Sequence, residues 1–244
     1  MSPIFYLIIV LTTLTILIFI SKIVFSSRTD ESIYLGTALV GNTGNLGIPL
    51  GIALFGVESV PYTSIINIAN VFFMYTISVY FFAREQFSLK EAIISIFKIP
   101  AIWFASLALF LNYYQIPINK HILMALDMGA YTSLTIQLFI FGVYLYSVRI
   151  KTIPWKLSLH ISFAKHFILP LIGIFIIIWF TDFNSFVASI LIMELMVPLA
   201  VNNVNFAVLY NCKPFAVAST ILVSSALFVG MLYFYIQIIE YFIK

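Results

Sequence analysis

Long apolar runs, separated by short polar stretches, follow one another along the whole chain. A helix that crosses a bilayer needs roughly 20 predominantly apolar residues. By this criterion the pattern predicts eight membrane-spanning helices, at residues 4–25, 33–55, 61–82, 99–116, 121–147, 157–180, 186–210 and 214–242. Residues 87–98 are instead amphipathic, which favours a helix lying along the membrane surface. The expected fold class is therefore an all-α polytopic membrane protein.

Composition supports this class and narrows the chemistry. Hydrophobic residues make up 63% of the 244 positions and charged residues only 9%, whereas a soluble domain carries about 25% charged residues. The single cysteine, Cys212, excludes an intramolecular disulfide and a cysteine metal cluster. The formal net charge of +3 is scattered, so nothing indicates a nucleic-acid partner. We expect neither a cofactor nor a bound metal.

The basic residues predict an orientation, because cytoplasmic loops of membrane proteins are enriched in lysine and arginine. Nine of them follow the first, third, fifth and seventh helices, at Lys22, Arg28, Arg84, Lys90, Lys98, Arg149, Lys151, Lys156 and Lys213. The opposite side holds only Lys120 and Lys244. We therefore expect a multi-pass protein of the plasma or inner membrane with both termini outside the cytoplasm.

The second predicted helix contains a stretch that is unusual at membrane depth, GNTGNLGIPLG at residues 41–51. Proline removes a backbone donor, and glycine permits unusual dihedral angles. Irregular backbone inside a membrane is tolerated where protein buries it or where it lines a polar cavity. We therefore expect this helix to break at Pro49.

A second break is expected in the seventh helix. IPLGI at residues 48–52 recurs as VPLAV at residues 197–201, each in the middle helix of a group of three. The two helices run in opposite directions, so the two groups would be inverted repeats. Matching interrupted helices in two halves indicate the binding site of a transporter.

Asparagines flank both predicted breaks and would meet on their cytoplasmic side. Amide side chains and the free N–H groups of half-helices both favour anions. The predicted substrate-binding residues are Asn42, Asn45, Pro49, Pro198, Asn202, Asn203 and Asn205. Second-rank candidates for the same cavity are Asn67, Asn70 and Gln137. The alternative is that these amides only hydrogen-bond neighbouring helices.

Ionisable residues within the predicted helices each require a reason, because burial in a bilayer is costly. Glu194 precedes Pro198 by four residues, so we expect it to act in the site or in coupling to protons or sodium. The alternative is a neutral glutamic acid hydrogen-bonded between helices. Lys165 is either a second coupling candidate or a lysine that extends to the cytoplasmic interface. His160 and His166 are expected at the interface and not at a metal.

Three segments resemble the auxin efflux carrier family, which includes bacterial permeases and plant PIN-type carriers. NTGNLGIPL at residues 42–50 is similar to the family's best-known motif, and MVPLAVNNVNFAVLY at residues 196–210 is similar to its second crossover helix. KHFILP at residues 165–170 is a less specific match. The resemblance covers essentially the whole chain.

The resemblance implies ten helices in two inverted groups of five, with two broken helices that cross, and a fold related to bile-acid sodium symporters. Here the breaks fall in the second and seventh helices, so the first two helices of the family are missing. The implied division is a truncated repeat at residues 1–86, a linker at 87–98 and a complete repeat at 99–244. In the family the missing pair helps to form the homodimer, which this departure puts in doubt.

The function expected from these features is secondary transport of a small organic anion, a carboxylate, by alternating access. No stretch resembles the phosphate-binding loop of ATPases. An intramembrane enzyme would need a nucleophile with a base, or paired acids, and the sequence places neither at the breaks. A further alternative is a non-transporting membrane subunit or an inactive, truncated member of the family.

Overall fold

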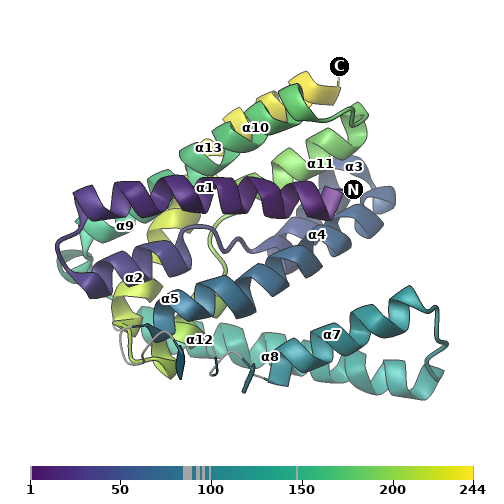
Figure 1. Ribbon diagram of the computed structural model, residues 1–244, viewed down its shortest axis with the longest axis horizontal. Helices are drawn as coiled ribbons and strands as arrows, with labels where there is room; N and C mark the ends of the chain where they lie inside the picture. Colours follow the sequence, from purple (N-terminus) through teal and green to yellow (C-terminus); the bar gives the residue numbers. More distant parts are fainter. Residues whose placement is uncertain are drawn as a thin grey trace.

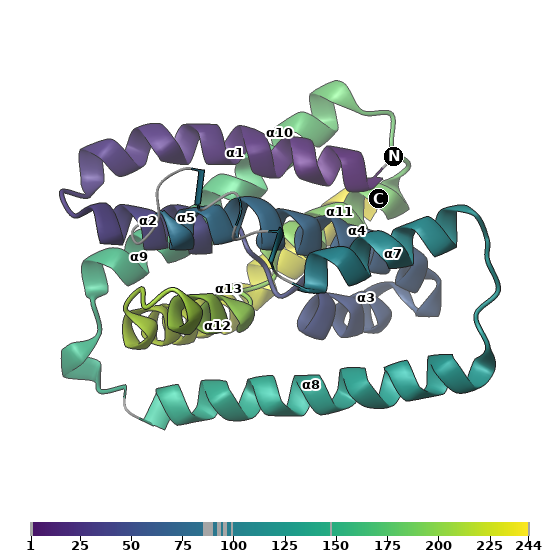
Figure 2. The same ribbon diagram turned by 60° about the horizontal axis from the view of Figure 1, so that its bottom comes forward.

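The computed structural model describes residues 2–84, 90–91, 94, 97–98, 100–146 and 148–243. All regular elements in these ranges are helices, which form a bundle with a helical hairpin along one side (Figures 1 and 2). Most of the amphipathic segment expected at residues 87–98 lies outside the described residues. The prediction of an all-helical protein is therefore confirmed for the part of the chain that can be described.

The bundle takes its first elements from the N-terminal third of the chain. These are α1 (Ser2–Val24), α2 (Arg28–Thr37), the π turn η1 (Thr43–Gly47), α3 (Ile48–Phe55), the 3₁₀ turn η2 (Val57–Ser59), α4 (Val60–Phe73), the π turn η3 (Met74–Ser78) and α5 (Val79–Ala83). The hairpin follows as α7 (Pro100–Tyr113) and α8 (Lys120–Tyr146). In both views α8 runs along the outer edge of the molecule.

The C-terminal third completes the bundle. Its elements are the 3₁₀ turn η4 (Ile150–Thr152), α9 (Trp155–Phe163), the π turn η5 (Ala164–Ile168), α10 (Leu169–Phe180), α11 (Ser185–Met196), α12 (Asn202–Leu209) and α13 (Pro214–Ile243). α11 packs against α4, α10 and α13, and α1 packs against α4 and α10. Elements from the two ends of the chain therefore form one core.

Four helical stretches in the described residues are long and apolar enough to cross a membrane, at Ser2–Val24, Val57–Ala83, Trp155–Phe180 and Pro214–Phe242. α1 shows how they pack: Tyr6, Ile9 and Thr13 are buried, whereas Phe19 and Ile23 are 66% and 87% exposed. A helix that is apolar all round is typical of a membrane span, with one face on protein and the other on lipid.

Each of the two shorter apolar helices, Thr43–Phe55 and Ser185–Met196, is one half of an interrupted helix. The first interruption lies between Thr37, where α2 ends, and Thr43, where η1 begins. The second lies between Met196 and Asn202. Both predicted broken helices are therefore interrupted.

The position of the first interruption corrects the prediction that the helix breaks at Pro49. Pro49 lies in the first turn of α3, which continues directly from η1. The wider π turn immediately before Pro49 accommodates the missing N–H and the bulk of the ring. A second π turn, η5, precedes Pro170 in the same way. Proline therefore changes the helical register at these positions without ending the helix.

The two interruptions pair with each other through the main chain. Gly41 and Leu199 form an isolated antiparallel bridge. The amide of Asn42 donates to the carbonyl of Pro198 at 2.8 Å, and the amide of Ala200 donates to the carbonyl of Val40 at 2.9 Å. Backbone groups that the interrupted helices leave free are thus satisfied by the opposite half of the chain.

Candidate functional site

The place where the two interrupted helices pair, at Gly41 and Leu199, is called the crossing below. A polar cavity of about 160 Å³ lies beside it. Backbone and side chains from both halves of the chain surround it, and none of the lining residues is charged. They are Gly41, Asn42, Thr43, Gly44, Asn45, Asn67, Asn70, Val71, Met74, Ala200 and Asn202. The cavity therefore offers amides, one hydroxyl and backbone groups to a ligand.

The N-terminus of the helix Thr43–Phe55 contributes unpaired donors to this cavity. The amides of Leu46 and Gly47 both donate to the carbonyl of Asn42. In contrast, the amides of Thr43, Gly44 and Asn45 have no acceptor among the described residues. Free N–H groups at a helix N-terminus, together with the helix dipole, favour an anion.

A hydrogen-bond network holds the wall of the cavity that α4 forms. Asn70 donates through Nδ2 to the carbonyl of Gly41 at 2.9 Å and to Oγ1 of Thr43 at 3.0 Å. The hydroxyl of Tyr6 donates to Oδ1 of Asn70 at 3.0 Å, which fixes the orientation of the amide. Thr43 in turn donates to Oδ1 of Asn67 at 2.8 Å. This network leaves Nδ2 of Asn67 as a donor.

Gly44 permits the close approach of α4. A Cβ atom at this position would lie 2.9 Å from Oδ1 and 3.1 Å from Nδ2 of Asn67. Real Cβ atoms rarely come so close to another heavy atom, so a larger residue would push Asn67 away from the cavity.

The second interruption is held by a comparable set of side chains. Ser224 on α13 accepts from the amide of Leu199 at 3.3 Å, and its hydroxyl lies 2.9 Å from Nε2 of His166. The hydroxyl of Tyr235 lies 2.9 Å from Nδ1 of His166 and 3.3 Å from its carbonyl oxygen. Pro170, four residues later, cannot supply the helical N–H for that carbonyl, and Tyr235 takes its place.

His166 corrects a second prediction. Its side chain is only 2% exposed, so it does not lie at an interface. The two interruptions are therefore built in the same way. A side chain of the helix that follows the interrupted helix (α4 or α13) binds the bridge residue, and a side chain of the helix that precedes it (at α1 or η5) contacts that first side chain. Asn70 and Tyr6 do this for Gly41, and Ser224 and His166 do it for Leu199.

Glu194 lies against the other side of η1. The residue is fully buried, and neither carboxylate oxygen has a hydrogen-bond partner within the described chain. A Cβ atom added to Gly47 would overlap Oε2 of Glu194 and lie 2.7 Å from Oε1. Only glycine at this position leaves room for the carboxyl group. The alternative of a glutamic acid hydrogen-bonded between helices therefore does not describe this structure.

Lys165 is also fully buried, which corrects the interpretation that it extends to the interface. Its ammonium group donates to the carbonyl of Leu195 at 3.1 Å, near the C-terminus of α11. A cation is favourable there because the last carbonyls of a helix carry partial negative charge. A Cβ atom at Gly41 would lie only 2.8 Å from Nζ, so Lys165 packs directly against the bridge.

The structure brings together some of the predicted binding residues and not others. Asn42, Asn45, Asn67, Asn70 and Asn202 all line the polar cavity. Asn203 instead donates to the carbonyl of Ala200 at 3.0 Å, and Asn205 is half-buried and is not one of the lining residues. Pro198 contributes its carbonyl to the crossing, Pro49 is exposed on α3, and the side chain of Gln137 is outside the described part.

Sequence reasoning missed Thr43, Tyr6 and Ser224. Thr43 stands inside the motif GNTGNLG, so its position next to the glycines was a signal. Tyr6 and Ser224 lie in apolar helices that carry several other hydroxyl groups, and such hydroxyls commonly bond only to their own helix. Among the described residues, no group of three or more His, Cys, Asp or Glu side chains could hold a metal ion.

Comparison with known proteins places this arrangement in a wider context. Residues 1–236 match a family model described as Membrane transport protein (Mem_trans). The match confirms the resemblance to the auxin efflux carrier family and covers both interrupted helices. A comparison with curated proteins found no match.

Proposed function

Because the chain belongs to the Membrane transport protein family, we propose that it is a secondary transporter that moves a small organic anion across the membrane by alternating access. The proposed substrate is a carboxylate, and the proposed site is the polar cavity at the crossing. Within the multi-pass membrane protein that the family match supports, this cavity joins both halves of the chain.

The observation that carries the proposal is the set of donors around the cavity. Three unpaired backbone N–H groups, at Thr43, Gly44 and Asn45, lie beside the amides of Asn42 and Asn202. A carboxylate accepts several hydrogen bonds at once, and bonds to a charged acceptor are stronger than neutral ones. No lysine or arginine lines the cavity. The substrate would therefore be held by uncharged hydrogen-bond donors and not by an opposite charge, so that it can dissociate after transport.

The volume limits the size of this substrate. The polar cavity is small, at about 160 Å³. It favours a short carboxylic acid, or the carboxylate end of a longer one.

Coupling is proposed to occur through Glu194, with Lys165 as the second participant. An ionised carboxylate that is buried without donors is costly, so binding of a proton or a sodium ion would stabilise it. Its contact with Gly47 gives a path to the substrate, because Gly47 belongs to the same π turn as Thr43 and Asn45.

The architecture supports the same mechanism. We propose that α1 to α5 and α9 to α13 are inverted repeats that move together, and that the hairpin α7–α8 belongs to the scaffold. Five features remain predictions. They are the division at residues 86 and 98, the eight membrane spans, the external termini, the plasma-membrane location and a homodimer. The similar construction around Gly41 and Leu199 supports the inverted repeat.

The test is a binding screen on the purified protein in detergent. A series of short carboxylates is compared with the corresponding methyl esters, using the unfolding temperature as the readout. We expect at least one carboxylate to raise this temperature and its ester to have no effect. A ligand that binds should then be exchanged across the membrane faster in proteoliposomes that contain the protein than in liposomes without it. Equal stabilisation by acids and esters, or binding without exchange, would contradict the proposed function.

A further inference from the structure

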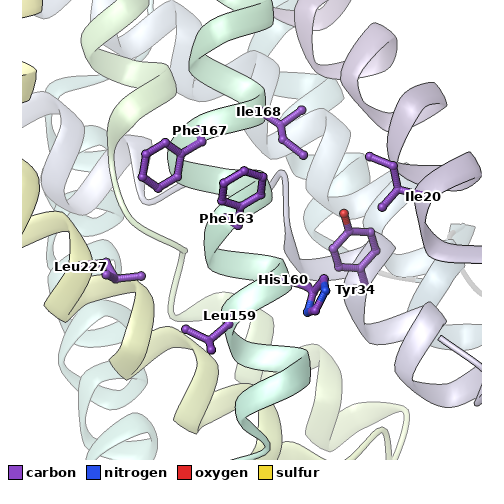
Figure 3. A pocket seen from close by; sticks show the side chains of 8 residues that line it. All are labelled: Ile20, Tyr34, Leu159, His160, Phe163, Phe167, Ile168 and Leu227. Carbon is purple, nitrogen blue, oxygen red and sulfur yellow. The ribbon is translucent and has the colours of Figure 1, made fainter. Parts of the chain in front are cut away.

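A second cavity, of about 530 Å³, lies away from the crossing and has a different chemistry. It is a groove whose lining residues come from α1, α2, α9, η5 and α13. In Figure 3, Phe163, Phe167 and Ile168 lie along one helix, with Ile20 and Tyr34 on one side and Leu227 on the other. The groove is thus lined almost entirely by apolar and aromatic side chains.

The walls of the groove are partly exposed on the outside of the protein. Leu159, Phe163 and Phe167 are between 39% and 55% exposed. The rings of Phe163 and Phe167 are stacked, with centroids 5.1 Å apart and planes at 24°, so they form a flat wall. From Leu159 to Ile168 the wall extends over roughly 14 Å at 1.5 Å per residue. One leaflet of the hydrocarbon core is about 15 Å deep.

One end of the groove is basic. The ring of His160 and the ammonium group of Lys156 both contact Phe25, at 5.7 Å and 5.8 Å from its ring centroid. Nδ1 of His160 donates to the carbonyl of Lys156 at 2.6 Å, which holds the ring beside Phe25. No carboxylate among the described residues pairs with Lys156. The neighbouring Asp30 is bound by Lys213 at 2.8 Å.

Phe25 and Lys156 at this basic end also line a third cavity, of about 470 Å³. Its lining includes Ser26, Ser27 and Trp155, so it is polar where the groove is apolar. Tryptophan is enriched at the level of lipid headgroups. In Figure 3 the hydroxyl of Tyr34 points into the apolar groove, where it can donate to an ester oxygen.

We propose that this groove binds one anionic phospholipid, with an acyl chain along Phe163 and Phe167 and the phosphate near Lys156 and His160. Lipid tails cover any apolar surface of a membrane protein, but two features here select one molecule. The groove is concave and has the depth of one leaflet, and its basic end complements a negative headgroup. In the orientation proposed above, that end faces the cytoplasmic leaflet, which is rich in anionic lipids.

The experiment measures the lipid that stays on the protein. Purified protein is equilibrated in micelles with equal amounts of phosphatidylglycerol and phosphatidylcholine that carry the same acyl chains, then washed, and retained lipid is quantified by mass spectrometry. We expect one phosphatidylglycerol per chain and at least fivefold less phosphatidylcholine. Equal retention of the two lipids would overturn the proposal.

Variants separate the two parts of the site. Leu227→Trp fills the groove from α13 and Leu159→Trp fills it from α9, so each should remove the retained lipid. If one variant fails to fold, the other still tests the proposal. Lys156→Gln should lower phosphatidylglycerol to the level of phosphatidylcholine. Leu171→Trp, at a site on α10 that is 64% exposed, is the control and should change nothing.

Full retention in both groove-filling variants would contradict the proposal. The proposal would also be contradicted if a second copy of the chain covers the groove. Light scattering would then show a dimer that dissociates in the Leu227→Trp variant. Neither readout depends on transport, so the lipid site and the proposed function can fail independently.

Discussion

At the scale of single residues, the cavity separates asparagines that a ligand can reach from those that only support the backbone. Asn45 and Asn202 line the cavity, whereas Asn205, on the same helix as Asn202, does not. A hydrogen bond to a charged group contributes about 1.5–3 kcal/mol. We therefore expect Asn45→Ala and Asn202→Ala each to weaken carboxylate binding roughly tenfold to a hundredfold. Titration of the purified variants with the carboxylate found by screening measures this.

Asn205→Ala is the matched control and should bind within about twofold of the native protein. If Asn205→Ala weakens binding as much as Asn202→Ala, the ligand does not occupy this cavity. If all three variants bind normally, the amides only join helices.

Glu194 supports a second prediction at this scale. Its carboxyl group is buried and has no hydrogen-bond partner in the described core, so the Glu194→Gln variant should fold and be at least as stable. The same variant should lose the dependence of transport on a proton gradient, because glutamine cannot exchange a proton. Uptake into proteoliposomes with and without a pH gradient gives the comparison. An unchanged response to the gradient would assign the coupling to Lys165.

At the scale of secondary structure, the interruptions are held by side chains from neighbouring helices. Ser224 binds the amide of Leu199 and contacts His166, so Ser224→Ala leaves buried polar groups without partners. The expected loss of stability is about 1–3 kcal/mol. It should appear as a fall of several degrees in the unfolding temperature in detergent.

Ser219 on the same helix provides the control for this comparison. Within the described residues its hydroxyl bonds only to the carbonyl of Phe215, one turn earlier. Ser219→Ala should therefore change stability by less than about 0.5 kcal/mol. Equal effects of the two substitutions would show that Ser224 does not support the crossing.

The elements also show which features local sequence can predict. Apolar runs located the helices, because helix length and hydrophobicity are local properties. The break assigned to Pro49 was wrong because proline is compatible with a helix that contains a π turn. The observed break, at residues 38–42, contains no proline and depends on pairing with Pro198 and Ala200. The glycines and asparagines from Gly41 onward indicate an irregular segment, but they do not show where in it the helix stops.

The same limit applied to the candidate site. The asparagines near Gly41 could be predicted because several amides close together are unusual in an apolar helix. Lys165 and His166 were placed too close to the interface, because counting residues from the helix end cannot reveal partners such as Leu195, Ser224 and Tyr235. These partners lie 30 to 69 residues away along the chain.

At the scale of the whole molecule, we predict that the polar cavity is reached from the cytoplasm. Asn45, which lines this cavity, is exposed. In a Cys212→Ser background, a membrane-impermeant thiol reagent should label Asn45→Cys from the cytoplasmic side. Ile116→Cys, in the turn between α7 and α8, should be labelled from the opposite side. Vesicles of both orientations allow the comparison, and labelling of both positions from one side would contradict the topology.

The bridge between Gly41 and Leu199 also has a consequence for biosynthesis. The two residues are 158 positions apart, and a ribosome adds about 5–20 residues per second. For roughly 10–30 s after they are synthesised, therefore, the carbonyl of Val40 and the amide of Asn42 lack their partners, because Pro198 and Ala200 have not yet been made. Each unpaired backbone group costs several kcal/mol in hydrocarbon. During this interval the nascent N-terminal half must keep its interrupted helix in contact with water or the insertion machinery.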